Sequence, residues 1–102
     1  MTIPESINLL GVTVPVIWWQ DHERSKKQLG YHGEAHFTTK TIYLAHTCRD
    51  KELSQPLKEH AFFHELLHQV LDSAGHGESG KDEQFVDLVA GLLHQALGPH
   101  MR

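Results

Sequence analysis

Several features that mark common classes of protein are scarce or missing in this chain of 102 residues. Cys48 is its only cysteine, so no disulfide can form within the chain and nothing indicates an oxidising compartment. No apolar run approaches the roughly twenty residues of a membrane span, and residues 1–5 lack the positive charge of a signal peptide. Acidic and basic residues are interspersed, with a formal charge of −4, which leaves no basic patch for nucleic acid. We therefore expect a soluble, cytoplasmic protein that binds neither nucleic acid nor membranes.

Length and composition limit the size of the fold. Only 39% of the residues are apolar, which supports one modest hydrophobic core and leaves little material for a second module. We expect a single domain over residues 1–102, which a bound metal ion would help to stabilise.

Histidine, by contrast, is abundant, since the chain has ten. Two of them form the motif His64-Glu65-x-x-His68, the HExxH arrangement of zinc hydrolases. A helix turns about 100° per residue, so His64 and His68 lie one turn apart and can both offer a ring nitrogen to one ion. Glu65 points elsewhere and suits a carboxylate that reaches a water on the metal. Because about 0.07 such motifs are expected by chance in so histidine-rich a chain, the motif has to be weighed with its surroundings.

The motif lies inside a predicted helix. Ser54 is a suitable N-cap and Pro56 falls in the first turn, whereas Ala74 and Gly75 end the pattern. The apolar residues that recur at helical spacing are Leu57, Ala61, Phe62, Phe63, Leu66, Leu67, Val70 and Leu71. On a helical wheel the two histidines of the motif lie at one border of this apolar arc, where a half-buried site is expected.

A catalytic zinc site needs a third protein ligand. Glu83 in the next predicted helix is our candidate, and Asp87 follows it by one turn on a stripe that continues to Ala90 and His94. Apolar residues flank this stripe, so we do not expect its acids to form a simple solvated face. A Glu and an Asp at this spacing soon after the motif have a chance expectation of about 0.06, which strengthens the metal-site prediction.

The link between the two predicted helices holds two competing third ligands, His76 and Glu78. Ser79 with Asp82 predicts a start of the second helix that resembles a capping box. Gly98 and Pro99 predict its end.

The motif together with the downstream Glu83-x-x-x-Asp87 resembles the gluzincin pattern of zinc metallopeptidases. In size, and in the glycine-containing β segment before the motif helix, the chain is most similar to the small minigluzincin or ImmA/IrrE-like proteins of phages and bacteria. The resemblance implies that His64, His68 and Glu83 bind Zn²⁺ and that Glu65 is the general base. It also implies that Asp87 accepts a hydrogen bond from a ligand imidazole, that of His64, and so orients it.

The first half of the chain carries strand patterns. Residues 12–19 are β-branched and aromatic, and Pro15 predicts either an edge strand or a strand that begins after the proline. Residues 31–37 and 41–46, separated by 38–40, predict a β-hairpin with a short turn.

The other segments of this half are less regular. Residues 3–10 fit a short helix or a strand equally well. Residues 21–28 are charged and predict a solvated loop or one to two helical turns. Residues 47–55 predict a polar connection in which Cys48 is a passive thiol rather than a fourth ligand.

Alternation along the hairpin strands can place His32, His36 and Tyr43 on one face. Each of them is a candidate donor of a hydrogen bond to a developing oxyanion, although strand residues of these types more commonly have no such role.

These elements predict an α+β fold in which a small antiparallel sheet packs on the motif helix, with the Glu83 helix alongside. The predicted function is zinc-dependent hydrolysis of a peptide bond in a protein or peptide substrate. One alternative is a non-catalytic zinc-binding domain that regulates or clamps a partner protein, and another is a helical interaction module with a chance motif. Glu65 argues against a purely structural zinc site, which has no use for this carboxylate and is normally closed by four protein ligands.

Overall fold

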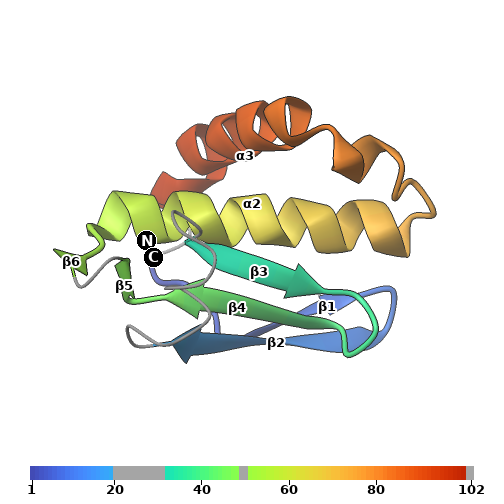
Figure 1. The fold of residues 1–102 in the computed structure, drawn as a ribbon, viewed down its shortest axis with the longest axis horizontal. Coiled ribbons are helices and arrows are strands. Elements are labelled where there is room, and N and C mark those ends of the chain that lie inside the picture. Colours follow the sequence, from blue (N-terminus) through green and yellow to red (C-terminus); the bar gives the residue numbers. More distant parts are fainter. Residues whose placement is uncertain (20–31, 49–50, 101–102) are drawn as a thin grey trace.

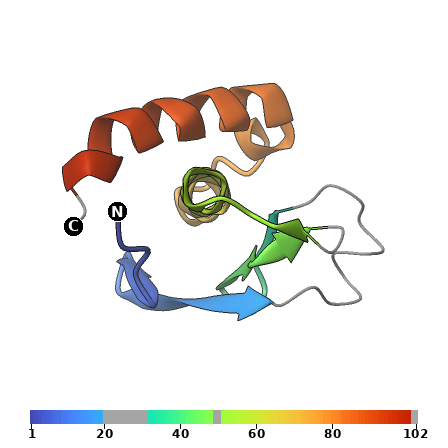
Figure 2. The same cartoon turned by 90° about the vertical axis from the view of Figure 1, so that its left-hand side faces the viewer.

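The computed structural model describes residues 1–19, 32–48 and 51–100. The fold is α+β, and Figure 1 shows helix α2 lying between a four-stranded sheet and helix α3. Figure 2 shows the same three layers along the axis of α2. The elements are β1 (Ser6–Leu9), β2 (Val12–Trp19), β3 (Gly33–His36), β4 (Thr41–Ala45), β5 (Thr47–Cys48), β6 (Lys51–Glu52), α2 (Gln55–Ser73), the 3₁₀ turn η1 (Ser79–Lys81), α3 (Glu83–Leu97) and the 3₁₀ turn η2 (Gly98–His100).

The four-stranded sheet is mixed, with the order β1-β2-β4-β3, so the prediction of a purely antiparallel sheet is wrong. β1 pairs with β2 and β3 pairs with β4 in antiparallel fashion, but β2 and β4 run parallel, with Val16 opposite Ile42. Ile42 and Leu44 of β4 are completely buried, whereas the more exposed β3 takes the edge. Burial of β4, the more apolar strand of the hairpin, thus places it next to β2, where it runs parallel to β2.

Strand β2 is an interior strand that contains Pro15, contrary to both alternatives that the sequence predicted. Its first half pairs with β1, and its second half, from Val16 onward, pairs with β4. The amide of Val16 donates to the carbonyl oxygen of Glu5 over 2.8 Å, so by strand alternation the nitrogen of Pro15 faces away from β1. It lies just before the ladder with β4 begins, and the proline therefore removes no ladder hydrogen bond.

The predicted β-hairpin is confirmed. β3 and β4 pair with His36 opposite Thr41, and Lys40 in the turn has a positive φ of 50°. Gln69 of α2 is fully buried, and its Nε2 donates to the carbonyl oxygens of His36 (3.0 Å) and Thr41 (3.1 Å). This side chain fixes the turn end of the hairpin to the helix.

The less regular segments have different outcomes. Residues 3–10, for which helix and strand were both open, contain the strand β1. The connection at 47–55 carries a two-residue antiparallel ladder between β5 and β6, and Cys48 is a half-buried free thiol. The predicted loop at 21–28 lies outside the described residues.

Helix α2 has the predicted boundaries. The side chain of Ser54 accepts a hydrogen bond from the amide of Leu57 (3.4 Å), Pro56 lies in the first turn, and the helix ends before Gly75, whose φ is +78°. In α3 the N-cap is Asp82, which accepts from the amide of Phe85 (3.1 Å). The predicted capping role of Ser79 is wrong, because Ser79 begins the separate turn η1. No helix in the described part of the chain has the length and apolar character needed to cross a membrane.

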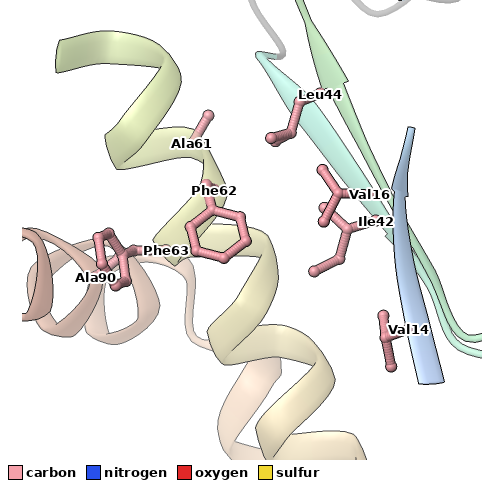
Figure 3. Packing of buried hydrophobic residues seen from close by; sticks show 8 residues of the cluster. All are labelled: Val14, Val16, Ile42, Leu44, Ala61, Phe62, Phe63 and Ala90. Atoms are coloured by element: carbon pink, nitrogen blue, oxygen red, sulfur yellow. The ribbon is translucent and has the colours of Figure 1, made fainter. Parts of the chain in front are cut away.

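The hydrophobic core lies on both sides of α2. Figure 3 shows the side chains of the two central strands pointing toward this helix. The buried cluster consists of Val14, Val16, Ile42, Leu44, Ala61, Phe62, Phe63 and Ala90. This packing fixes the position of α2, and with it the HExxH motif, relative to the sheet and to α3.

Candidate metal centre

The three ligands predicted from the sequence come together in space. Nε2 of His64 lies 3.0 Å from Oε2 of Glu83, and Nε2 of His68 lies 3.1 Å from Oε1 of the same carboxylate. The possible ligand atoms of all three residues lie within 4.8 Å of one another. Two adjacent turns of α2 and the first residue of α3 thus present two imidazoles and a carboxylate to one point.

The tight connection between the helices brings Glu83 to this point. After Gly75 reverses the chain, η1 leads directly to Asp82, whose capping hydrogen bond starts α3 beside the motif. The competing ligands His76 and Glu78 belong to neither possible metal-binding group of the described residues. Glu78 instead accepts from Nζ of Lys81 over 2.9 Å at the surface. The geometry therefore favours Glu83 over both competitors.

The donor set fits a zinc ion. Two imidazole nitrogens and a carboxylate oxygen form one of the ligand sets of catalytic zinc sites. Bonds of about 2.1 Å at tetrahedral angles would place ligand atoms about 3.4 Å apart, close to the separations of 3.0 and 3.1 Å found here. His64, His68 and Glu83 are therefore residues that could hold a zinc ion at this point.

The protonation state of His68 suits a metal ligand. Burial lowers the pKa of His68, the charge of His64 acts in the same direction, and the charge of Glu83 opposes both. The imidazole is therefore neutral at pH 7, so its nitrogen can bind a metal without first losing a proton.

Glu65 lies beside the two histidines, on the side of α2 that faces β3. Its residue exposure is only 8%, and burial, together with the charges of Glu83 and Glu34, raises the pKa of Glu65 to about 8. A Cβ atom at Gly33 would lie 3.1 Å from Cγ of Glu65 and 2.7 Å from the carbonyl oxygen of Tyr43. The strand can approach Glu65 this closely because position 33 has no side chain.

An open cavity of about 680 Å³ lies over the two histidines, Glu65 and Glu83. Residues 33–39 form one wall, and Gly77, Gly80 and Lys81 form another. The cavity leads from solvent to the point where the three candidate ligands meet, so a substrate segment has room to reach them.

Strand β3 leaves one edge open at this cavity. Among the described strands, it has a neighbour only on the side of β4. The carbonyl oxygen of His32 accepts from the amide of Ala45 over 2.9 Å, so the backbone polar groups of Gly33 and Ala35, one and three positions later, face the open edge. Both of these residues line the cavity.

Asp87 lies where its predicted role requires. Its Oδ1 is 3.2 Å from Nδ1 of His64, the ring nitrogen that does not face Glu83. The same oxygen is 2.9 Å from Nε2 of His60, a residue that the sequence reasoning missed. The spacing His60-x-x-x-His64-x-x-x-His68 was the available signal, because it continues the motif stripe by one turn.

Of the three candidate oxyanion donors, His32 lies beside Glu65. Both residues line a second cavity of about 180 Å³, together with His60 and Asp87. Burial lowers the pKa of His32, and the charge of His60 lowers it further. A neutral His32 can still donate one hydrogen bond, so it remains a candidate.

The other two candidates share a face, as predicted, but this face is directed away from α2. Ile42 and Leu44 point into the core, so Tyr43 between them points outward, and its ring stacks on Trp19 with centroids 5.0 Å apart. His36 packs edge-on against Tyr43 at 4.7 Å. Tyr43 lines neither of the two cavities, whereas His36 lies in the wall of the larger cavity, which Glu65 also lines.

Comparisons with models of protein families, with curated proteins and with solved structures find no match for this chain.

Proposed function

We propose that the protein is a zinc-dependent metallopeptidase of the gluzincin type. His64, His68 and Glu83 hold the zinc ion, and Glu65 is the general base. The observation that carries the proposal is the convergence of two imidazoles and a carboxylate beside a buried carboxyl group, at the floor of an open cavity. If the HExxH sequence had arisen by chance, there would be no reason for a carboxylate from another helix to lie within hydrogen-bond distance of both histidines.

In the proposed hydrolysis of a peptide bond, the zinc ion and Glu65 have separate roles. Zinc, when bound, lowers the pKa of a water molecule and polarises the scissile carbonyl group. Glu65 accepts the proton that this water loses on attack and passes it to the leaving amine. In the metal-free protein the raised pKa of Glu65, about 8, keeps this group protonated at pH 7. The positive charge of a bound zinc ion would lower this pKa and so favour the ionised form that acts as a base.

The shape of the site supports a proposal for the class of substrate. The open edge of β3 offers backbone donors and acceptors at Gly33 and Ala35 beside the cavity. An extended peptide can add to such an edge as a further strand, with main-chain hydrogen bonds that do not depend on its sequence. We infer a protein or peptide substrate whose scissile bond lies opposite Glu65.

A non-catalytic zinc-binding domain that regulates a partner is the second candidate. It explains the three ligands but not Glu65, because a buried carboxyl group that binds no metal destabilises the fold when it ionises. The open cavity over the ligands also favours turnover over a closed structural site.

The decisive experiment compares the wild type with Glu65→Gln, which keeps the shape of the side chain and removes the base. Both zinc-loaded proteins are incubated with a peptide library from a digested proteome, and new termini are identified by mass spectrometry against a chelated control. We expect both proteins to bind zinc, and the variant to cleave about 10²–10⁴-fold more slowly. Equal cleavage by both proteins would contradict the role of Glu65, and the absence of zinc from the wild type would overturn the whole proposal.

A further inference from the structure

Asp87 is shared by two histidines of α2. Its Oδ1 lies 2.9 Å from Nε2 of His60 and 3.2 Å from Nδ1 of His64. His60 and His64 are one helical turn apart, so their rings project toward the same point on α3. The three side chains form a cluster that continues from the proposed zinc ligand away from the metal.

The carboxylate needs such support because it is exposed. The side chain of Asp87 is 62% exposed and that of His60 is 35% exposed. A carboxylate held by a single hydrogen bond at the surface can rotate into water, and the bond to His64 is the longer of the two.

We propose that His60 is a positioning residue of the metal centre. Its Nε2–H holds the carboxylate of Asp87 in the orientation in which Oδ1 accepts from Nδ1–H of His64. This contact fixes the ring of His64 with Nε2 directed toward Glu83 and the zinc position. The inference rests on the zinc site proposed above.

The same cluster also has the donor atoms for a second cation, because His60, His64 and Asp87 each offer a ligand atom within 4.8 Å of the others. This use would require His64 to bind metals through both nitrogens and therefore to lose both ring protons. The hydrogen-bonded arrangement needs only the ordinary neutral imidazole, with one nitrogen protonated. We therefore favour a positioning role, and metal stoichiometry distinguishes the two.

The test measures zinc affinity by competition with a chromophoric chelator, so it does not depend on a substrate. His60→Leu should weaken zinc binding by about 10-fold, the lower end of the range for residues that support a metal ligand. His60→Gln should restore most of the affinity, because its amide nitrogen can donate to Asp87 in place of Nε2. In an Asp87→Ala background, His60→Leu should have little further effect, since the acceptor is already lost.

The chain offers a matched control in His94→Leu. This variant removes another hydrogen bond between α2 and α3, from His94 to Glu59 at 2.7 Å. The His94 ring lies edge-on to that of His60 at 6.5 Å, but His94 belongs to neither possible metal-binding group of the described residues. The variant should alter thermal stability without altering zinc affinity, whereas a general loosening of the helix pair would weaken binding in both leucine variants.

Three results would overturn the inference. These are an unchanged affinity in His60→Leu, full additivity of His60→Leu with Asp87→Ala, and a fall from two bound zinc ions to one in His60→Leu. The first two would leave the zinc site proposed above intact. A wild type that binds no zinc would reject both proposals.

Discussion

Helix α2 has two sides of opposite character. The side that faces the two central strands of the sheet is apolar and closed, with Val14, Ile42, Leu44 and Phe62 all completely buried. The single buried amide among these contacts, Gln69, has its nitrogen bonded to two carbonyl oxygens of the hairpin. This interface depends on buried area, so its stability does not require an ion.

The side that faces α3 is apolar only along a narrow strip around Phe63, Val86 and Ala90. Beside this strip runs a row of histidine–carboxylate contacts, which are His68–Glu83, His64–Glu83, His64–Asp87, His60–Asp87 and His94–Glu59. Exposed pairs of this kind contribute little by themselves. An ion bound across both helices would add its binding free energy to this weaker interface.

The two sides of α2 therefore have different roles in the structure. The sheet side holds the motif in place, and the α3 side supplies the proposed third ligand and the contacts that would support it. If this division is correct, changes at the α3 side should act through the metal, and changes at the sheet side should act regardless of it.

The largest effect is expected from His68→Ala, which removes a proposed zinc ligand. This variant should lose zinc binding, measured as metal content after gel filtration, while Glu78→Ala should retain it because Glu78 is bonded to Lys81 outside the centre. Hydrogen exchange in α3 should rise to the level of the chelated wild type, with the sheet unchanged. Full zinc content in His68→Ala would contradict the proposed metal centre on the α3 side. Zinc loss in Glu78→Ala would indicate that Glu78, and not Glu83, is the third ligand.

A pH effect is expected in the metal-free protein from Glu65, the titratable group on the sheet side of the motif. Its folded pKa of about 8 is above the ordinary value of 4.5, so the native state keeps a proton that the unfolded chain loses. The free energy of unfolding should therefore fall as pH rises from about 4.5 to about 8, by up to about 5 kcal/mol from this group.

Denaturant titrations of the wild type and Glu65→Gln across this range measure the contribution. The lowered pKa of His68 acts in the opposite direction. Below about pH 6.5 the unfolded chain binds a proton at this residue more readily than the native state does, so the free energy of unfolding falls as the pH falls. Because both proteins contain His68, their difference isolates Glu65. Parallel pH profiles would show that burial does not perturb this carboxyl group.

Phe62→Ala tests the sheet side. Removal of a completely buried aromatic ring should cost about 3–5 kcal/mol in the free energy of unfolding. The loss should be the same with zinc and with chelator, because the ring does not contribute to the metal centre. Leu88→Ala is the control, since Leu88 is 64% exposed and its change should stay within about 0.5 kcal/mol. A loss seen only in zinc would contradict the separation of the two sides.

The smallest effect is expected from Asp87→Asn, which keeps the shape of the acceptor but removes its charge. Zinc affinity should fall about 10–100-fold, which corresponds to about 1.4–2.7 kcal/mol. Asp72→Asn is the matched control, because Asp72 pairs with Lys40 away from the centre at 2.8 Å. Equal affinities in the two variants would place Asp87 outside the metal centre.

Features that depend on neighbouring residues were predictable from the sequence. The ends of α2 follow from Ser54, Pro56 and Gly75, and the hairpin follows from alternation around a short turn. The convergence of His64 and His68 follows from helix geometry once the helix is known. Each of these predictions needs no more than a few consecutive residues.

The sequence by itself thus determined the helix that carries the HExxH motif and the pairing of the hairpin, because hydrogen bonds and caps between near neighbours decide them. Only the tertiary structure decided the parallel pairing of β2 with β4, the place of Pro15 inside the sheet and the orientation of Tyr43 away from the centre. It also decided that Glu83 reaches the histidines, and that His60 shares Asp87. These outcomes depend on which apolar strands and which helix faces pack against one another, and this packing is decided by segments that are distant in the sequence.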